Sequence, residues 1–229
     1  MVEIISKENM HLYTDIMEDM HRMRYRIAVS EWGWRIPGIK PGYDKDNFDT
    51  EETIYFVSLS KANGRVVACG RLNPTTGPNL LRDVFPHHCQ FEEVPCDPAI
   101  YELSRYIVDH RALSKEEMVV TRGQISSAFN SFCIQSGIRA VSVLTYMSSY
   151  ARSLKYWPTR PLGRPVYYKE DNATYIAALC QMSTEGLEKL RSGFSLAKDQ
   201  PRMTARFDNA NLPPIRRIQS LTAGHTVAA

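Results

Sequence analysis

The chain has 229 residues, enough for one large domain with a buried core. Hydrophobic residues make up 43% and charged residues 23%, as in ordinary globular proteins, and a net charge of +3 argues against general electrostatic binding of nucleic acid. The apolar runs of a signal peptide or a membrane span are missing from the sequence. We therefore expect a cytoplasmic protein with neither a nucleic-acid nor a membrane partner.

The first half of the chain is predicted to contain a helix, a long loop and a hairpin. Apolar side chains from Leu12 to Ile27 recur at three- and four-residue steps, which predicts a helix over residues 9–29. Glycines and prolines interrupt this pattern over residues 32–50, which indicates a long loop of the kind that often carries function. The β-rich runs 53–60 and 65–72 flank Asn63 and Gly64, which favour a tight turn between antiparallel strands.

The second half of the chain alternates strands and helices. A strand is predicted over 101–108, and a helix over 115–136 that begins with a capping box of Ser114 and Glu117 and ends at Gly137. Strands are also expected over 140–145, 166–168 and 174–182, and helices over 147–156 and 184–192. This order predicts an α/β fold, a three-layer α/β/α sandwich with a mixed central sheet. Residues 1–195 form one domain in this prediction, and residues 196–229 a loosely ordered tail.

The residues that suggest chemistry fall into four clusters. Each has an ordinary explanation by itself: acids in a loop are usually just solvated, and Glu102 with Arg105 suits a simple ion pair. The five cysteines are an odd number without C-x-x-C spacing, so we expect neither a disulfide framework nor a zinc site. The clusters comprise Arg24 with Trp32 and Trp34; the run from Asp44 to Asp49; residues 70–72 with Thr75 to Pro78; and residues 102–106.

Taken in this order, the clusters resemble the acyl-homoserine-lactone synthase family. The resemblance rests on Arg24 with Trp34 ten residues later, on D-x-F-D at 46–49, on R-L followed by T-T-G-P at 71–78, and on E-L-S-R-Y at 102–106. It spans about residues 20–110 and continues more weakly to about 190. Ala28 stands where the family usually has Phe, and Asp44 where it usually has Glu, which changes the shape of the presumed pocket and shortens the reach of one carboxylate.

The resemblance implies an N-acetyltransferase-like fold and a reaction in two parts. The amine of S-adenosylmethionine attacks an acyl thioester, and the methionyl carboxylate then closes a lactone and releases methylthioadenosine, with no cofactor besides the substrates. Glu102 is the expected base, acting through water, and backbone N–H groups around Ser104 and Arg105 are the expected donors to the thioester oxygen. Trp34 is expected to form a wall beside the adenosyl or acyl group. We expect one interlocked charged cluster that orders the 32–50 loop, formed by Arg24, Arg71 and Arg105 with Asp46, Asp49 and Glu102.

One geometric difficulty concerns the strand that carries Glu102 and Arg105. Side chains alternate along a regular strand, so these two point to opposite faces of the sheet. Either a β-bulge lies between them, or they serve different faces.

The acyl and carrier sites are expected in the second half of the chain. The family resemblance points to Phe85, Leu144, Thr145 and Met147 as walls of the acyl pocket, with plain core packing as the alternative. The donor is an acyl carrier protein or an acyl-coenzyme A. An acidic carrier protein would bind a basic patch around Arg152 and Lys155, to which Arg160 and Arg164 also contribute.

Two other functions remain open from the sequence. One is a different N-acyltransferase of similar fold that uses acyl-coenzyme A. The other is a non-enzymatic binding module that uses the basic and aromatic residues of 152–168.

Overall fold

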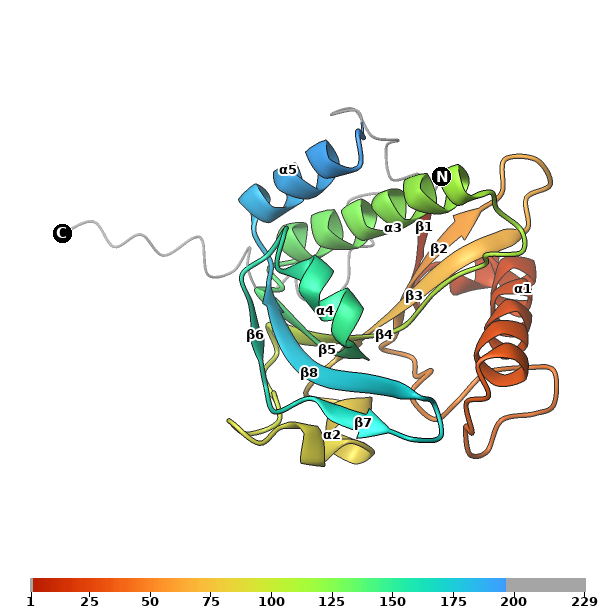
Figure 1. Ribbon diagram of the computed structural model, residues 1–229. Helices are drawn as coiled ribbons and strands as arrows, with labels where there is room; N and C mark the ends of the chain where they lie inside the picture. Colours follow the sequence, from red (N-terminus) through yellow and green to blue (C-terminus); the bar gives the residue numbers. More distant parts are fainter. Residues whose placement is uncertain (1, 197–229) are drawn as a thin grey trace.

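The computed structural model describes residues 2–196, and these form a mixed sheet with helices on both faces (Figure 1). The strand order is β1-β2-β3-β4-β5-β8-β6, and β7 also pairs with β8. Every pairing is antiparallel except β4 with β5. The strands are β1 (Val2–Ile5), β2 (Ile54–Leu59), β3 (Val66–Pro74), β4 (Ile100–Val108), β5 (Ala140–Tyr146), β6 (Thr159–Pro161), β7 (Val166–Tyr168) and β8 (Ala173–Gln181).

The long helices over 115–136 and 184–192 match the prediction closely, and the short elements were missed. Of the described elements, β1, α2, β6 and the 3-10 turns had not been predicted, and the helix expected over 147–156 ends at Ser153. The described helical elements are η1 (Met10–Leu12), α1 (Thr14–Arg24), η2 (Tyr25–Glu31), α2 (Leu80–Asp83), η3 (Pro86–His88), α3 (Lys115–Gln135), α4 (Met147–Ser153) and α5 (Thr184–Gly193). The predicted tail, apart from Leu196, lies outside the described residues.

The single helix expected over residues 9–29 is wrong in detail. The segment begins as the 3-10 turn η1, continues as α1 and ends as the π-helix η2. Because a 3-10 turn has a different pitch from an α-helix, Leu12 leaves the apolar stripe and is half exposed, whereas Met20 and Ile27 are fully buried. The wider π-helical turn follows directly after Arg24, a residue of the charged site described below.

Apolar side chains cover both faces of the sheet. On one face α3 covers the β1–β4 half, with Phe56 and Phe129 in the core; on the other face α1 covers it, with Met20 and Ile107 in the core. Figure 1 shows α1 beside the β1–β4 half of the sheet, and α3, with α5 packed outside it, on the other side. A third apolar cluster lies under α2 and η3 and includes Leu81. The three-layer arrangement is thus built from strands that bury both faces.

The prediction for the ends of α3 is confirmed. Ser114 Oγ accepts from Glu117 N at 3.2 Å, and the Glu117 carboxylate accepts from Ser114 N at 2.8 Å, so both halves of the capping box are present. Gly137 follows the helix with φ of 72°, a left-handed conformation that suits glycine. These local signals fix the helix that connects β4 to β5.

The strands β4 and β5 pair only at their beginnings. Three residue pairs, from Ile100 with Ala140 to Glu102 with Ser142, form the parallel contact. Beyond Glu102 the strand β4 continues for six residues, to Val108, without pairing to β5, whereas β5 pairs with β8 along its whole length. The backbone edge of β4 that faces β5 beyond this point is therefore not used by the ladder.

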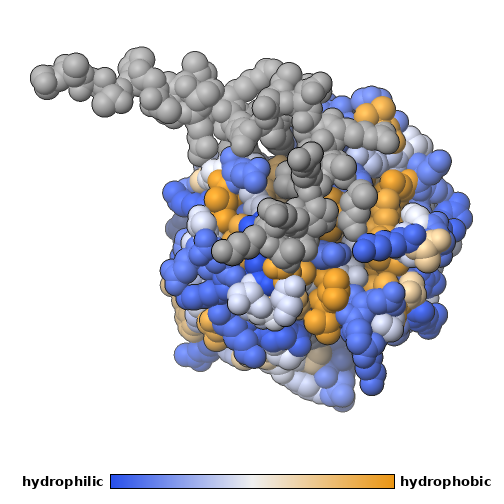
Figure 2. Space-filling view, turned by 90° about the horizontal axis from the view of Figure 1, so that it is seen from above, coloured by the Kyte–Doolittle hydropathy of each residue, from blue (hydrophilic) through white to orange (hydrophobic). Residues whose placement is uncertain are grey.

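The outer face formed by α3 and α5 is mixed in character. Figure 2 shows hydrophilic residues with apolar ones between them on the face seen from above, and Val119 and Val120 of α3 are about half exposed. No helix among residues 2–196 is long and apolar enough to cross a membrane.

Candidate active site

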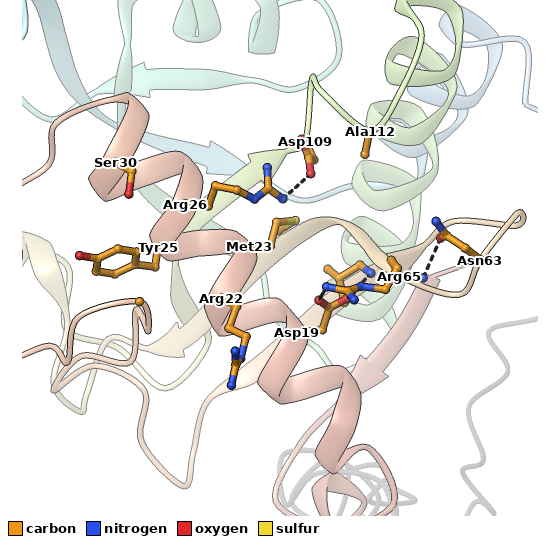
Figure 3. A pocket seen from close by; sticks show the side chains of 12 residues that line it. Asp19, Arg22, Met23, Tyr25, Arg26, Ser30, Asn63, Arg65, Asp109 and Ala112 are labelled. Carbon is orange, nitrogen blue, oxygen red and sulfur yellow. Dashed lines mark hydrogen bonds and ion pairs between the residues drawn. The ribbon is translucent and has the colours of Figure 1, made fainter.

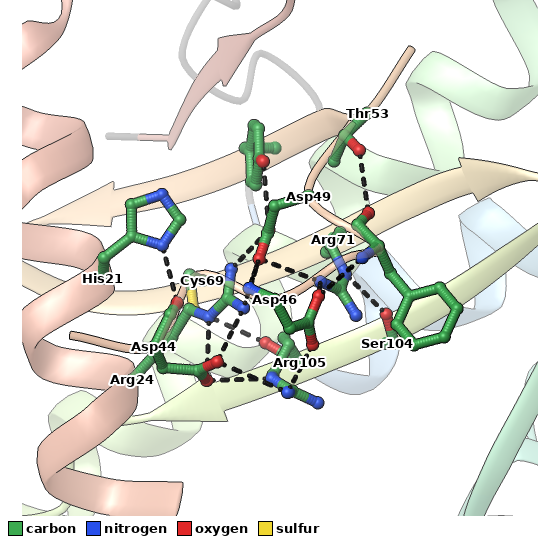
Figure 4. Close-up of polar contacts among 12 residues, drawn as sticks. His21, Arg24, Asp44, Asp46, Asp49, Thr53, Cys69, Arg71, Ser104 and Arg105 are labelled. Atoms are coloured by element: carbon green, nitrogen blue, oxygen red, sulfur yellow. Dashed lines mark hydrogen bonds and ion pairs between the residues drawn. The ribbon is translucent and has the colours of Figure 1, made fainter. Parts of the chain in front are cut away.

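Three arginines and three aspartates meet on the α1 face of the sheet (Figure 4). The arginines come from the end of α1, from β3 and from the middle of β4, and the aspartates all come from the loop between η2 and β2. The six residues are Arg24, Arg71 and Arg105 with Asp44, Asp46 and Asp49. We call them the charged cluster.

Arg24 binds two of the aspartates. Its Nη1 and Nη2 donate to the two carboxylate oxygens of Asp49 at 2.8 and 3.0 Å. Its Nε and Nη2 donate to Asp44, each at 3.2 Å. The side chains of all three residues are fully buried. Arg24 therefore fastens two points of the loop to the end of α1.

Arg105 and Arg71 share Asp46. Arg105 donates from Nη2 to Asp46 at 2.6 Å and from Nε to Asp44 at 2.9 Å. Arg71 donates from Nη1 to Asp46 at 2.5 Å and lies 3.1 Å from Asp49, while its Nε donates to Ser104 Oγ at 3.0 Å. Each aspartate thus contacts two arginines, and each arginine contacts two aspartates.

The charges of the cluster keep Asp44 and Asp49 ionised. Burial raises the pKa of Asp49, but the opposing charges of Arg24 and Arg71 outweigh burial and hold that pKa well below its usual range. The pKa of Asp44 is lowered in the same way, by Arg24 and Arg105 against burial. For Arg105, burial and repulsion by the other two arginines lower the pKa, but a guanidinium still remains protonated in proteins.

Backbone contacts tie the loop to the cluster. Asp46 N donates to the Asp49 carboxylate and Phe48 N to the Asp46 carboxylate, each at 2.9 Å. His21 Nδ1 donates to the Asp44 carbonyl at 2.7 Å, and Asp44 N donates to the His21 carbonyl at 3.1 Å. The loop predicted over 32–50 is therefore held to α1 and to the sheet by its own acids.

A β-bulge resolves the difficulty with Glu102 and Arg105. Cys69 pairs with Ile107 and Arg71 with Ser104, so two residues of β4, at 105 and 106, face one residue of β3. Arg105 has φ of 52°, the left-handed conformation of the first residue in one class of bulge, where glycine is usual. Because of the extra residue, Arg105 lies on the same face as Ser104 and Glu102.

The structure differs from the prediction in the partner of the arginines. Three acids do face three arginines, but Asp44 occupies the place that had been predicted for Glu102. The carboxylate of Glu102 instead accepts from Leu80 N at 2.8 Å and Leu81 N at 2.7 Å, at the start of α2. Burial raises the pKa of Glu102 although these two N–H donors lower it. The sequence did contain a signal for Asp44, because this residue begins the acidic run that also holds Asp46 and Asp49.

Trp34 borders the charged cluster. The Arg105 guanidinium carbon lies 5.4 Å from the centre of a Trp34 ring, a cation–π arrangement, and Trp32 packs 5.3 Å from the same side chain. Trp34 N donates to the carbonyl of Ala28 at 2.9 Å, so the position where the family usually has Phe is directly beside it.

The four residues expected to line the acyl pocket do not share one surface. Phe85 and Leu144 pack against the same apolar cluster under α2. Val143 packs on the opposite face of β5, and Thr145, two residues on, follows it there because side chains alternate. Met147 is the first residue of α4. The structure therefore brings together Phe85 and Leu144, and places Thr145 and Met147 elsewhere on β5 and α4.

The basic patch expected for a carrier protein is small. Arg152 lies in the last turn of α4 and donates to Ser149 Oγ at 2.9 Å, and Lys155 follows shortly after; both are exposed. Arg160 forms an ion pair with Glu92, which neutralises its charge. The aromatic residues Tyr156 and Trp157 lie against glycines of α5 and support that helix.

An open groove of about 470 Å³ lies on the other side of α1 (Figure 3). Three arginines point into it, and each has an acidic neighbour: Arg26 contacts Asp109 at 2.6 Å, Arg65 contacts Asp19, and Arg22 contacts Glu18. None of the six residues of the charged cluster lines this groove.

Comparisons with known proteins identify the family. The family model described as autoinducer synthase matches residues 8–190. The chain is 34% identical over 97% of its length to the isovaleryl-homoserine lactone synthase of Bradyrhizobium diazoefficiens, and it covers 100% of that protein. It also resembles a solved CoA-dependent acyl-homoserine lactone synthase, BjaI, in complex with SAM and isopentyl-CoA, at 31% identity and a TM-score of 0.78, over 96% of this chain and 99% of the other. A second CoA-dependent acyl-homoserine lactone synthase, MesI, is 25% identical with a TM-score of 0.77, over 87% of this chain and 98% of the other.

The chain shares the α/β/α sandwich expected from the sequence with solved acyl-homoserine lactone synthases. The chain belongs to the autoinducer synthase family, and its enzyme class is that of the acyl-homoserine-lactone synthases. The non-enzymatic binding module that the sequence had left open is thereby set aside.

Proposed function

We propose that this chain transfers a short branched acyl group from coenzyme A to S-adenosylmethionine and closes the lactone. The full-length relative named for isovaleryl-homoserine lactone and the neighbour solved with SAM and isopentyl-CoA support this donor. The observation in this chain that carries the proposal is the buried charged cluster beside Ser104 and Glu102, at the place where β4 leaves β5. Residues 1–195 act as one catalytic domain in this proposal.

In the first step the amine of S-adenosylmethionine forms an amide. Glu102 accepts a proton from the ammonium group through a water molecule, and the raised pKa of this carboxyl makes it a stronger base than an ordinary glutamate. The amine nitrogen attacks the thioester carbon, the carbon–sulfur bond breaks, and coenzyme A leaves as the thiol after taking up a proton. The negative charge on the thioester oxygen needs N–H donors, and the unpaired edge of β4 near Ser104 and Arg105 is well placed to supply them.

In the second step the methionyl carboxylate attacks its own γ-carbon. The carbon–sulfur bond of the sulfonium breaks, and the electron pair leaves with methylthioadenosine, so no further cofactor is required. Because the sulfonium is already a good leaving group, the enzyme mainly has to hold the carboxylate in line. Arg71 suits this task, since a guanidinium binds carboxylates in fixed geometry. Trp34, over Arg105, supplies an apolar wall for the adenosyl group.

The acyl chain is proposed to enter between Phe85 and Leu144. These two side chains pack against the same apolar cluster under α2, which suits an apolar chain. A coenzyme A donor is also consistent with the exposed surface, because the ion pair of Arg160 with Glu92 leaves only Arg152, Lys155 and Arg164 as a weak basic patch for an acidic carrier protein. Both substrates are metabolites of the cytoplasm, where we place the reaction.

A donor panel tests the proposal. The purified protein is incubated with S-adenosylmethionine and isovaleryl-, butyryl- or hexanoyl-coenzyme A, or with the same acyl groups on acyl carrier protein. Mass spectrometry then measures acyl-homoserine lactone and methylthioadenosine. We expect both products, in equal amounts, with the highest rate from isovaleryl-coenzyme A. If products formed only from the carrier-protein donors, the proposed coenzyme A donor would be wrong. If methylthioadenosine formed with none of the donors, the proposed reaction would be wrong.

A further inference from the structure

Two buried polar atoms beside the charged cluster have no hydrogen-bond partner within residues 2–196. They are Arg71 Nη2, a donor, and Asn73 Oδ1, an acceptor. The two residues are 0% and 1% exposed. A buried polar group without a partner is destabilising, so two of them on neighbouring side chains require an explanation.

The orientation of both side chains is fixed by their other contacts. Arg71 uses Nε for Ser104 Oγ at 3.0 Å and Nη1 for Asp46 and Asp49, which leaves Nη2 free. Asn73 Nδ2 donates to the carbonyl of Phe48 at 2.9 Å. Because a carbonyl only accepts, the amide of Asn73 cannot be turned over without losing this bond, and Oδ1 is the end that remains unpaired.

The sheet register places Arg71 and Asn73 next to Ser104 and Glu102. Arg71 pairs with Ser104, and Asn73 pairs with Glu102, across β3 and β4. Directly opposite residues have Cβ atoms roughly 5 Å apart, and residues two apart along a strand are separated by roughly 6.7 Å. Arg71, which has an unpaired donor, and Asn73, which has an unpaired acceptor, are thus neighbours on one face of the sheet, and Ser104 and Glu102 pair with them on the next strand.

This pattern matches the amino-acid end of S-adenosylmethionine. A carboxylate and an amine attached to the same carbon present an acceptor and a donor next to each other. Each would supply the missing hydrogen-bond partner of one of the two unpaired atoms. We propose that Asn73 Oδ1 binds the α-amine of S-adenosylmethionine while Arg71 Nη2 binds its α-carboxylate. Asn73 is then a substrate-binding residue that holds the nucleophilic nitrogen beside Glu102, the proposed base. This inference rests on the proposed function.

The role of Asn73 persists through the first step. The ammonium, the free amine and the product amide each carry at least one N–H, so the Oδ1 acceptor has a donor at every stage. Asn73 therefore positions the nitrogen and neither gains nor loses a proton itself.

Binding measurements separate this role from a structural one. Calorimetry compares S-adenosylmethionine, its desamino analogue and methylthioadenosine on the wild-type protein and on Asn73→Ala. We expect the substitution to weaken S-adenosylmethionine about tenfold, as for one lost hydrogen bond to a charged group. Methylthioadenosine and the desamino analogue lack the amine, so their affinities should stay the same. No acyl donor takes part, so a failed donor panel and a failed binding test are distinguishable.

Two further variants control for the loss of the bond to Phe48. Thr53→Val removes the other side-chain donor to the same carbonyl, which lies at 3.1 Å, and should leave the preference for S-adenosylmethionine over its desamino analogue intact. Asn73→Asp keeps an acceptor at the Oδ1 position and should restore that preference. Equal weakening of all three ligands by Asn73→Ala would make the residue structural. Unchanged affinities would mean that a water molecule bridges the two atoms, and either result overturns the proposal.

Discussion

Arg24 Nη1 and Nη2 donate to the two carboxylate oxygens of Asp49, at 2.8 and 3.0 Å, and neither side chain is exposed. Removing one partner of such a pair leaves the other as an uncompensated buried charge. We expect Asp49→Asn to lower the free energy of unfolding by about 3 kcal/mol, measured by urea denaturation. Glu51→Gln is the control, because the ion pair of Glu51 with Lys7 is exposed and should contribute nothing measurable. Equal effects of the two substitutions would show that the charged cluster does not hold the fold.

Acid should unfold the protein through the same aspartates. The folded pKa values of Asp44 and Asp49 lie below their ordinary value, so both contribute stability at a pH above the unfolded value of about 3.9. That contribution is lost as the pH falls from there through the folded pKa, because the unfolded chain binds protons more readily. Thermal melting between about pH 6 and pH 3 should show a falling midpoint, and Asp49→Asn should reduce the slope below pH 4. A wild-type slope in the variant would contradict this assignment.

Glu102 should control the acidic limb of the pH–rate profile. Burial raises its pKa, and a base is active only when deprotonated, so kcat/KM should rise with pH through a value above the ordinary 4.3 or so of a glutamate. Glu102→Gln keeps the shape and removes the base. We expect kcat to fall about 100-fold or more. The acidic limb of the pH–rate profile should disappear, and the affinity for S-adenosylmethionine should change little. Near-normal turnover in this variant would remove Glu102 from the base role.

Backbone strain at Arg105 can be measured by comparing two variants. Arg105 adopts φ of 52°, which glycine tolerates and alanine does not. Arg105→Gly and Arg105→Ala both remove the guanidinium group, so their difference isolates the backbone. We expect Arg105→Gly to be more stable by about 1 kcal/mol in urea denaturation. Equal stability would mean that the bulge relaxes when the arginine contacts to Asp44 and Asp46 are lost.

Leu144 should limit the length of the acyl chain. It packs with Phe85 on the apolar cluster under α2, and truncation to alanine opens space there. We expect Leu144→Ala to raise kcat/KM for hexanoyl-coenzyme A relative to isovaleryl-coenzyme A by about tenfold, as for one or two buried methylenes. Thr145→Ala is the matched control, because Thr145 lies on the opposite face of β5 and should leave the ratio unchanged. A change in ratio only for the control would place the acyl chain on the other face.

The sequence predicted those parts of the fold and site that depend on local signals. The hairpin at Asn63 and Gly64 and the capping box at Ser114 are contained within a few residues, and both were found. The short elements β1, α2 and β6 span too few residues for periodicity to be visible, and the π-helix after Arg24 does not change the apolar spacing enough to be recognised.

In the site, too, the features with a sequence motif were predicted and those set by tertiary contacts were not. The arginines and aspartates were predicted to meet because their motifs occur in a recognised order, but the choice between Asp44 and Glu102 depended on which one faces α1 and which one faces α2. That choice is made by tertiary contacts: Glu102 binds the N–H groups of Leu80 and Leu81, a partnership that no spacing in the sequence indicates. The bulge at Arg105 was foreseen only as one of two alternatives, since an arginine in a glycine conformation has no local signature.

The parallel pairing of β4 with β5 has a consequence for how the enzyme forms. These strands are separated in sequence by α3, so their contact closes a long segment, whereas the neighbouring hairpin β2–β3 closes a short one. Long-range pairing of this kind is slow. During synthesis on the ribosome, the half of the sheet that carries Arg71 and Arg105 can assemble before the half that carries Leu144 exists. We therefore expect the side that carries the charged cluster to become ordered first, and competence for the acyl donor to appear only after the chain has passed β8.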